Sequence, residues 1–204
     1  MKVLIACEFS GAVRDAFKAA GHNAWSCDLQ ATEAPGQHIQ GDVLEAIRGQ
    51  HWDLMVAHPP CTYLSSSGLH WNHRRPGRAE LTEAALDFVR ALLDAPIEKI
   101  ALENPVGCIS SRICKPDQII QPWQFGHADS KATCLWLKNL PPLVPTEIIL
   151  RARYDNQTPS GQNKLPPSPD RWKERSRTYE GIALAMAQQW GAAVIAPPAK
   201  LFAF

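Results

Sequence analysis

The chain has 204 residues, of which 45% are hydrophobic, and its 21 lysines and arginines are nearly balanced by 20 aspartates and glutamates. This length supports one ordinary hydrophobic core, so we expect a single catalytic domain over residues 1–204. The near-zero net charge excludes a protein that binds nucleic acid through its overall charge, and any such surface must come from local patches.

The cysteines and the apolar runs indicate the compartment. Six cysteines stand apart without CxxC spacing, and no secretory leader is recognisable, so we expect reduced thiols and a cytoplasmic protein. Cys108, Cys114 and His127 fit no standard zinc spacing, and we expect no metal site. No apolar run approaches the roughly 20 residues of a membrane span, so we expect no membrane contact.

The first element is an apolar strand, Lys2 to Ala6, followed by the turn Cys7-Glu8-Phe9-Ser10-Gly11 and by apolar residues at helical spacing up to Gly21. A small-residue turn before a helix lets a ligand approach the backbone, as nucleotide-type cofactors do. Since the turn has one glycine where a dinucleotide fingerprint has three, it does not identify a ligand by itself.

Acidic residues follow the next two strands. The strand Asn23 to Cys27 ends at Asp28, where a carboxylate can accept hydrogen bonds from both hydroxyls of a ribose. We expect a third strand over Ile39 to Val43, whose Asp42 is suited to accept from an adenine amino group. The alternative is that both are solvated acids at strand ends.

The fourth strand delivers a cysteine. The apolar run that begins at Asp53 stops at Pro59-Pro60, because two prolines cannot continue a ladder of hydrogen bonds. This places Cys61 at the carboxyl edge of the sheet, where ligands bind in open α/β sheets.

The loop from Tyr63 to Arg78 carries several rings and three arginines, among them Arg74 and Arg75. We interpret it as a mobile lid over a base and its phosphate, the alternative being a solvated connector. An amphipathic helix over Ala79 to Leu93 then leads into a fifth strand, Lys99 to Pro105.

The fifth strand ends with Glu103-Asn104 and so offers a carboxylate beside the cysteine. This pair suits an enzyme that attacks an electron-poor ring carbon with a thiolate while an acid protonates a ring nitrogen. The alternative is that Cys61 is a small buried hydrophobe and Glu103 a cap.

These residues resemble a known family. Pro59-Pro60-Cys61 followed by Leu64-Ser65 and Gly68, and then Leu102-Glu103-Asn104, closely resembles the two catalytic motifs of the cytosine-C5 DNA methyltransferases. The resemblance covers about residues 3 to 137 and the terminal helix that opens at Thr178-Tyr179-Glu180-Gly181. It includes a partial match of Phe125-Gly126 through Thr133, in which Lys131 stands for the first arginine of the family's glutamine-arginine-arginine motif.

The resemblance implies the chemistry. Together with the alternation of strands and helices, it predicts a three-layer Rossmann-like α/β fold with a mostly parallel twisted sheet and helices on both faces. It further implies that Cys61 adds to C6 of cytosine, that Glu103 protonates N3, and that Lys131 contacts the base or its backbone. The implied ligands of S-adenosylmethionine are Phe9, Ser10, Gly11, Asp28, Asp42, Pro59 and Gly181, and the implied substrate contacts are Pro60, Ser65, Asn104, Arg74 and Arg75.

The chain also departs from the family. Thr62, Thr133 and Ile182 stand where Gln, Arg and Asn are expected. Residues 150–177 form a short Pro-rich insertion where full-length enzymes carry a target-recognition domain, as in compact phage-type members. Its basic end, Arg171 to Arg177, is equally suited to bind phosphates or to form a helix surface.

We therefore expect methyl transfer to cytosine in duplex or single-stranded DNA, or in a smaller pyrimidine nucleotide. We expect the protein alone to have little sequence discrimination, so that a partner or a homodimer would supply any longer sequence readout. One alternative is an amino-methyltransferase, in which His58-Pro59-Pro60-Cys61 replaces an Asp-Pro-Pro-Tyr motif and Glu103 has no role. Another is an inactive homologue that binds the cofactor or nucleic acid without turnover.

Overall fold

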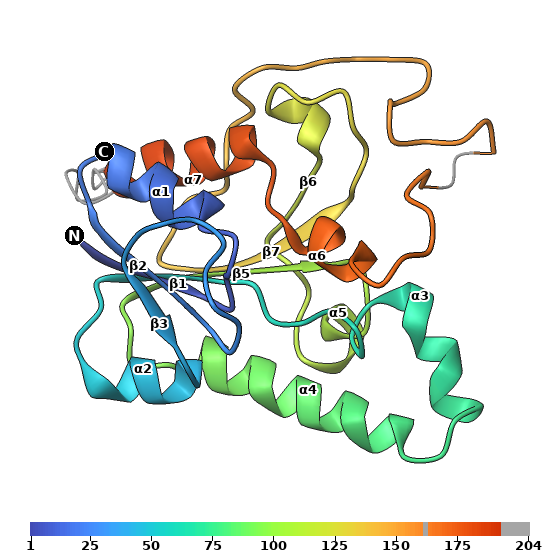
Figure 1. Ribbon diagram of the computed structural model, residues 1–204, viewed down its shortest axis with the longest axis horizontal. Helices are drawn as coiled ribbons and strands as arrows, with labels where there is room; N and C mark the ends of the chain where they lie inside the picture. Colours follow the sequence, from blue (N-terminus) through green and yellow to red (C-terminus); the bar gives the residue numbers. More distant parts are fainter. Residues whose placement is uncertain (161–162, 193–204) are drawn as a thin grey trace, which may run out of the picture.

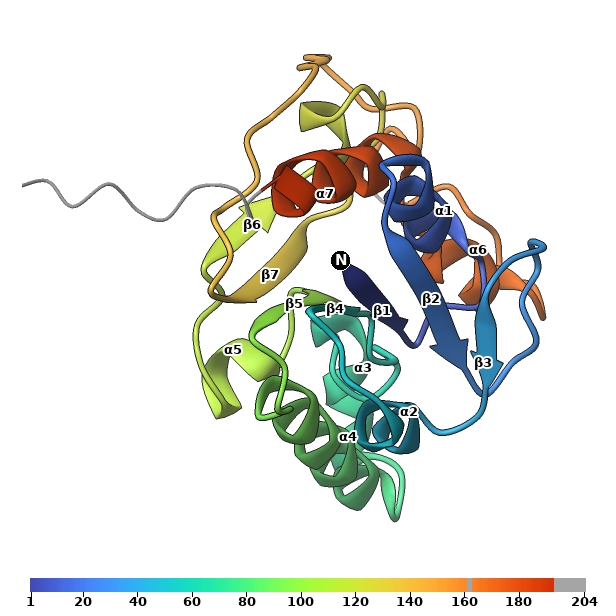
Figure 2. The same ribbon diagram turned by 90° about the vertical axis from the view of Figure 1, so that its left-hand side faces the viewer.

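A computed structural model describes residues 1–160 and 163–192, and within them the chain forms one seven-stranded sheet with helices on both faces (Figures 1 and 2). The strands are β1 (Lys2–Ala6), β2 (Asn23–Asp28), β3 (His38–Gln40), β4 (Leu54–Ala57), β5 (Lys99–Pro105), β6 (Gln118–Ile120) and β7 (Thr133–Lys138). The helices are α1 (Ala12–Ala19), α2 (Val43–Gly49), α3 (Ser66–Leu69), α4 (Arg78–Leu93), α5 (Ile109–Arg112), α6 (Arg171–Ser176) and α7 (Glu180–Ala192), with 3-10 turns η1 (His70–His73) and η2 (Pro122–Gln124).

The sheet has the strand order β3-β2-β1-β4-β5-β7-β6. The first five strands in this order are parallel, whereas β7 runs antiparallel to both β5 and β6. The predicted mostly parallel sheet is therefore confirmed. Because β7 runs backwards, the residues that precede it lie at the same edge as the residues that end β5.

Alternation along the central strands explains the three layers. On β1, Leu4 and Ala6 join a core packed under α2 and α4, while Val3 and Ile5 join a second core packed under α1 and α7. A strand with both faces covered reads as a continuous apolar run, as β1 and β4 do. Figure 2 shows the helix pairs on opposite sides of the sheet, as predicted.

Two predicted segments have a different structure. The third strand ends at Gln40, and Val43 begins α2 because Asp42 caps that helix, its Oδ1 accepting from the Leu44 amide at 2.8 Å. The segment from Tyr63 to Arg78 contains α3 and η1 rather than being an open loop, and η1 packs against α4.

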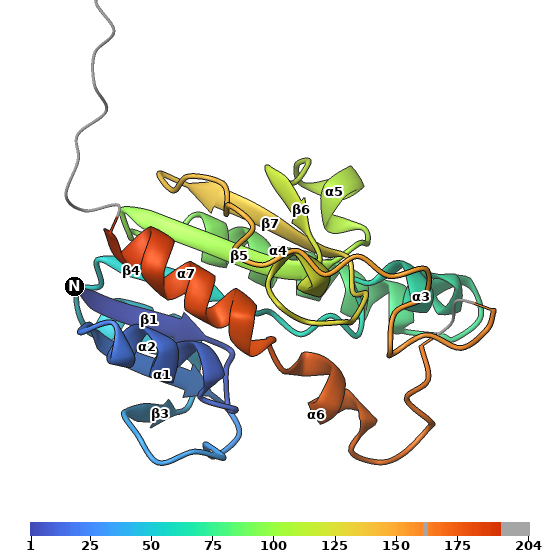
Figure 3. The same ribbon diagram turned by 90° about the horizontal axis from the view of Figure 1, so that it is seen from above.

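Residues 150–160 and 163–170 have no helix or strand apart from one isolated bridge between Gln157 and Asn163. The basic cluster that follows forms α6, which lies at the carboxyl end of the parallel strands (Figures 1 and 3).

All six cysteines are free thiols. In the part of the chain that the structure describes, no helix is long and apolar enough to cross a membrane.

Arg14 on α1 fixes the loop between β2 and β3. Its side chain is fully buried, and it donates to the Ser26 and Thr32 hydroxyls and to the carbonyl oxygen of Ala34. A Cβ added at Gly36 would come within 2.6 to 2.8 Å of the Arg14 guanidinium. The conformation of the loop between β2 and β3 is thus held by its hydrogen bonds and close contacts with Arg14.

We predict that Arg14→Ala lowers the free energy of unfolding by about 2–4 kcal/mol, because it leaves a cavity and several buried acceptors without a donor. Arg14→Lys recovers little, since an ammonium group cannot span the same acceptors. The matched control is Arg90→Ala, an exposed arginine paired with Asp87, with an expected loss of less than about 0.5 kcal/mol. Urea denaturation measures all three, and equal losses for Arg14 and Arg90 would contradict the assignment.

Candidate functional site

The ends of β4 and β5 are tied together by one buried side chain. The Asn104 side chain is 2% exposed, and its Nδ2 donates to the Pro59 carbonyl at 2.7 Å. Beyond Pro59 the chain turns at Cys61, whose carbonyl accepts from the amides of Leu64 and Ser65. The Asn of the Glu-Asn motif therefore positions the backbone that carries the cysteine.

A second set of contacts holds the following turn. The Cys108 amide donates to the Leu64 carbonyl at 2.8 Å, and the Ser66 amide donates to the Val106 carbonyl at 3.0 Å. A Cβ on Gly107 would overlap that same Leu64 carbonyl, so glycine is required by close approach. The loops after β4 and β5 form one unit.

Lys131 reaches the same edge from β7. The register pairs Pro105 with Thr133, so a residue two positions before Thr133 lies beyond the carboxyl end of β5. The Lys131 amide donates to Gln121 Oε1 at 2.9 Å, and its Nζ donates to the Arg175 carbonyl at 3.0 Å. This links β7 to α6.

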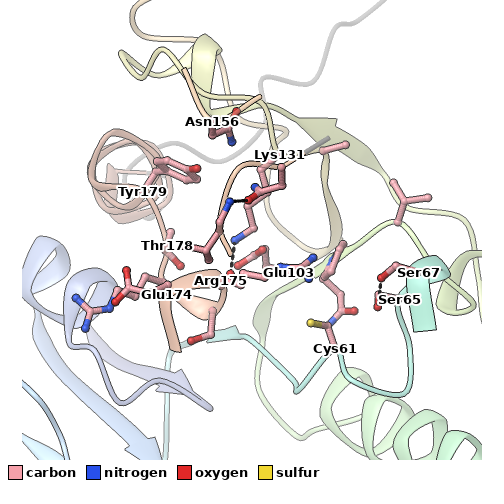
Figure 4. Close-up of a pocket in the computed structure, with 18 of the residues that line it drawn as sticks. Cys61, Ser65, Ser67, Glu103, Lys131, Asn156, Glu174, Arg175, Thr178 and Tyr179 are labelled. Atoms are coloured by element: carbon pink, nitrogen blue, oxygen red, sulfur yellow. Dashed lines mark hydrogen bonds between the residues drawn. The ribbon is translucent and has the colours of Figure 1, made fainter. Parts of the chain in front are cut away.

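These segments enclose a pocket of about 820 Å³. Figure 4 shows Cys61, Glu103, Lys131 and Arg175 around one opening. The three predicted catalytic residues are thus brought together from the ends of β4 and β5 and from the start of β7. Predicted substrate contacts Pro60, Ser65 and Asn104 also line the pocket, with Pro59, Tyr179 and Arg177 among the other lining residues.

Glu103 has a close partner, His58. The His58 Nδ1 lies 2.7 Å from Glu103 Oε2, and both side chains are about one-tenth exposed. Burial pushes the pKa of Glu103 upward, but the hydrogen bond and charge of His58, with the charge of Lys131, outweigh burial and lower this pKa. Glu103 is therefore held as a carboxylate by its neighbours.

The Cys61 thiol has a raised pKa. Burial is the main cause and the Glu103 charge adds to it, while the charges of Arg175 and Lys131 act in the opposite direction. The cations that act on Cys61 therefore come from α6 and from Lys131, which precedes β7.

Arg74 and Arg75 lie apart from the pocket. Both are exposed, neither lines the pocket, and the Arg75 guanidinium stacks on Trp71 at 4.3 Å. Arg78 is bound instead to the Thr62 carbonyl and stacks on Tyr63. Their predicted contact with substrate phosphates remains a prediction.

Tyr179 closes the pocket on the α7 side. Its ring lies 5.1 Å from that of His127 and 5.9 Å from Lys131 Nζ. Burial, followed by the charge and hydrogen bond of Asp129, raises the pKa of Tyr179 to about 12. The phenol therefore stays neutral at physiological pH.

The predicted cofactor edge lies beside this pocket. Cys7 has φ 60° and Gly11 has φ 80°, so the chain turns sharply between β1 and α1. Burial raises the pKa of Cys7 beyond the usual range, and the charges of Asp28, Cys27 and Asp42 add to this effect. The two predicted carboxylates thus lie around one turn, as the strand order requires.

The start of α1 is already occupied by a side chain. The buried Glu8 carboxylate accepts from the amides of Val13 at 2.7 Å and Arg14 at 3.2 Å. These two N–H groups are therefore occupied by a side chain, and the predicted cofactor contacts of Phe9, Ser10 and Gly11 remain predictions. Burial raises the pKa of Glu8, against the charges of His58 and Arg14 and the two backbone hydrogen bonds.

The α6 segment covers Phe9. The rings of Phe9 and Trp172 lie 5.7 Å apart, and Arg177 forms a 2.8 Å ion pair with Glu33. The void that remains beside the turn between β1 and α1 has a volume of about 40 Å³. It is lined by Cys7, Glu8, Phe9, Ser10, His58, Ser176 and Thr178.

The carboxylates at this edge are acceptors of the kind that the ribose and adenine of S-adenosylmethionine would need, and their predicted contacts remain predictions. Asp28 lies at the end of β2 with one oxygen bound to the Gln30 amide at 2.9 Å, and Asp42 begins α2. His58, Ser176 and Thr178 line both the void and the large pocket, so the two spaces adjoin. This void is much smaller than ordinary ligand pockets of about 300–1,000 Å³, so binding of an adenosine there would require α6 to move away from Phe9.

Gly181 has a packing role. A Cβ there would overlap the Phe125 carbonyl, and the Gly181 amide donates to His127 Nε2 at 2.9 Å. Its predicted cofactor contact remains a prediction.

No cluster of three or more His, Cys, Asp or Glu that could bind a metal ion occurs among residues 1–160 and 163–192.

Sequence reasoning missed His58 and Arg175. His58 follows β4 directly, and a titratable residue between a strand and a double proline was a usable signal. Arg175 was considered only as part of a basic cluster, because nothing in the sequence indicates that residues 171–177 return to the cysteine.

No known protein-family profile and no curated protein matches the chain. Among solved structures, it is similar to an E. coli protein that is encoded within a prophage and described as a candidate DNA modification methyltransferase. The TM-score is 0.45 and the identity 12%, over 73% of this chain and 52% of that chain. The chain thus spans about half the length of that protein, and a similarity at this level carries no argument about activity.

We predict that alkylation of Cys61 by iodoacetamide is slower at pH 7.5 than that of a free cysteine, because a raised pKa lowers the thiolate fraction. The rate should keep rising above pH 9. Arg175→Met removes a cation that lowers the pKa, so alkylation at pH 8 should slow further, by up to about tenfold for one pKa unit. Arg112→Met, an exposed arginine paired with Glu83, is the control.

Mass spectrometry of the Cys61 peptide gives these rates. Alkylation faster than that of free cysteine, or an equal effect of the two arginine substitutions, would contradict the assigned electrostatics.

Proposed function

We propose that this protein transfers a methyl group from S-adenosylmethionine to C5 of cytosine, in DNA or in a smaller pyrimidine nucleotide, through a covalent adduct at Cys61. The observation that carries the proposal is the single pocket lined by Cys61, Glu103 and Lys131, which come from three separate strand ends. A thiol, a carboxylate and a cation in one pocket are the groups that nucleophilic addition to a pyrimidine ring requires.

The residues have distinct roles in this proposal. The Cys61 sulfur adds to C6 as the thiol proton is released, so that an S–C6 bond forms, and N3 gains a proton through Glu103, which must first take one up because it rests as a carboxylate. C5 then takes the methyl group and loses its proton to a base, and the S–C6 bond breaks to release Cys61. Lys131 lies close enough to Glu103 and Cys61 to affect both pKa values, and it orients the base or neutralises charge on it.

The cofactor supplies an electrophilic methyl group when it is bound. Asp28 would hold its ribose, Asp42 its adenine amino group and Phe9 its ring. The neighbourhood of His58 and Thr178 supports this arrangement, since the cofactor edge and the base pocket meet there.

The pocket also bears on the substrate. Lys131, Lys164, Arg175 and Arg177 lie along its lining, against the acidic Glu103, Asp129 and Glu174. Cations at the edge of such a pocket favour a substrate that carries phosphate, and phosphate contacts position a substrate without reading its sequence. A specificity partner or a second copy of the chain would then supply sequence readout.

We predict that Asp28→Ala weakens S-adenosylmethionine binding by about 10-fold to 100-fold, because it removes charge-assisted hydrogen bonds to the ribose. Trp172→Ala should instead tighten binding, by about 2-fold to 10-fold, since a ring contact worth about 0.5–1.5 kcal/mol no longer holds α6 over Phe9. Isothermal calorimetry measures both affinities.

Asp87→Ala, on the exposed face of α4, is the control for Asp28. An unchanged affinity in Asp28→Ala would refute the ribose assignment. A weaker affinity in Trp172→Ala would mean that Trp172 stacks on the adenine rather than excluding it.

We further predict that DNA containing 5-fluorocytosine traps the protein in a complex that survives denaturation, because fluorine at C5 prevents the final proton removal. Cys61→Ser abolishes trapping, whereas Cys114→Ser, which changes an exposed thiol, leaves it intact. Gel electrophoresis and peptide mass spectrometry detect the adduct.

Methyl transfer without any adduct would favour the amino-methyltransferase alternative. Cofactor binding without methyl transfer to duplex DNA, single-stranded DNA, RNA or nucleotides would favour the inactive homologue.

A further inference from the structure

His58 forms a hydrogen bond with the buried Glu103 and lies near a second buried carboxylate, Glu8, in another part of the site. The β4–β5 register pairs Ala57 with Leu102, so the next residues, His58 and Glu103, lie side by side just past the ladder. This register explains the 2.7 Å contact between Nδ1 and Oε2. The contact is therefore built into the sheet.

The other side of His58 faces the cofactor edge. His58 and Glu8 line the same small void, and the charge of His58 lowers the pKa of Glu8. Nε2 is buried and has no hydrogen-bond partner within the described residues. Glu8 itself is 6% exposed and fixed by two α1 amides. His58 therefore contacts one buried carboxylate, Glu103, and lies close to a second one, Glu8.

We propose that His58 is a positioning residue that holds Glu103 with its second oxygen free for the substrate and stores the proton that Glu103 passes to the base. The proposal rests on the proposed function and adds a residue to which the resemblance assigns no role. The Nδ1–H of His58 donates to Oε2 of Glu103, so Oε1 of Glu103 remains available to the pyrimidine.

In this proposal His58 carries protons on both nitrogens before addition, Glu103 is a carboxylate and Cys61 is a thiol. As the S–C6 bond forms, one proton moves from the His58–Glu103 pair to N3, and the proton released by the Cys61 sulfur takes its place on the pair. When the S–C6 bond breaks, N3 gives up its proton through the pair to the Cys61 sulfur, and the C5 proton leaves separately to a base.

The neighbouring charges are consistent with this role. The groups that face the pair from the surrounding elements are Glu8 after β1, Cys61 after β4, Lys131 before β7 and Cys134 on β7, with Arg175 of α6 acting on Cys61. The hydrogen bond and charge of His58, followed by the charge of Lys131, lower the pKa of Glu103 against the effect of burial, so Glu103 is poorly protonated while it is paired with His58. A proton source beside it is therefore required.

The first experiment needs no activity. In protein labelled with ¹⁵N-histidine, the His58 resonances are identified by their loss in His58→Asn. We expect both ring nitrogens to be protonated at pH 7 in the wild type and one of them to be deprotonated at the same pH in Glu103→Gln. A neutral His58 ring in the wild type, or no change in Glu103→Gln, overturns the proposal.

The second experiment measures methyl transfer against pH. His58→Asn keeps a donor toward Glu103 but cannot store a proton, so we expect kcat at pH 7.5 to fall by about 10²-fold and to recover as the pH is lowered, with KM little changed. A structural role would lower the rate equally at every pH, and that result would overturn the proposal.

His51→Asn is the matched control, because His51 forms an exposed pair with Asp53 at 3.1 Å. It should change neither the resonances of His58 nor the pH profile. If the wild type methylates nothing, the proposed function fails, while the NMR experiment still decides whether the pair stores a proton.

Discussion

The hydrogen bond from Asn104 Nδ2 to the Pro59 carbonyl is the constraint on which the site depends. Two prolines stop β4 and leave the following turn without a ladder, so the turn needs another anchor. Asn104 provides it from the end of β5, and the Glu103 side chain is thereby fixed beside the same turn. Removing this amide would cost more than the net stability that one hydrogen bond contributes, because the Pro59 carbonyl would be left buried and unpaired at a cost of about 1–3 kcal/mol. The relative position of the Cys61 thiol and the Glu103 carboxylate is thus set by the adjacent strands β4 and β5.

The sequence predicted the strands and helices that depend on local residue patterns. It did not predict the side-chain contacts that depend on how neighbouring strands align. Apolar runs were sufficient for β1, β2, β4 and β5, and helical spacing was sufficient for α4. Asp42 was ambiguous, since an acid before apolar residues marks either a strand end or a helix cap, and the Leu44 amide decides for the cap. The partnership of His58 with Glu103 depends on how β4 and β5 align, and no sequence pattern reports that alignment. For the same reason, the return of Arg175 to the pocket could not be predicted.

The contact between α6 and Phe9 connects the two halves of the site. Trp172 covers Phe9 on the cofactor side, while the Arg175 carbonyl accepts from Lys131 on the substrate side. A movement of this short helix therefore changes both the space beside the turn and the position of a cation in the pocket. Because α6 buries none of its own residues and the Arg177–Glu33 pair is partly exposed, the movement opposes modest interactions. Cofactor entry and organisation of the base pocket are then coupled through one segment.

The burial that raises the pKa of Cys61 does not oppose the proposed addition. A neutral half-buried thiol reacts slowly with general electrophiles and oxidants, so the free protein is protected. During addition Cys61 loses a proton while N3 gains one, and the proton released by sulfur can refill the His58–Glu103 pair. The net charge of the pocket therefore stays constant through the step. A reaction that creates no new buried charge avoids the large desolvation penalty of an unpaired ion. Burial thus suppresses the thiolate in the absence of a base and permits the addition when a base can take up the proton.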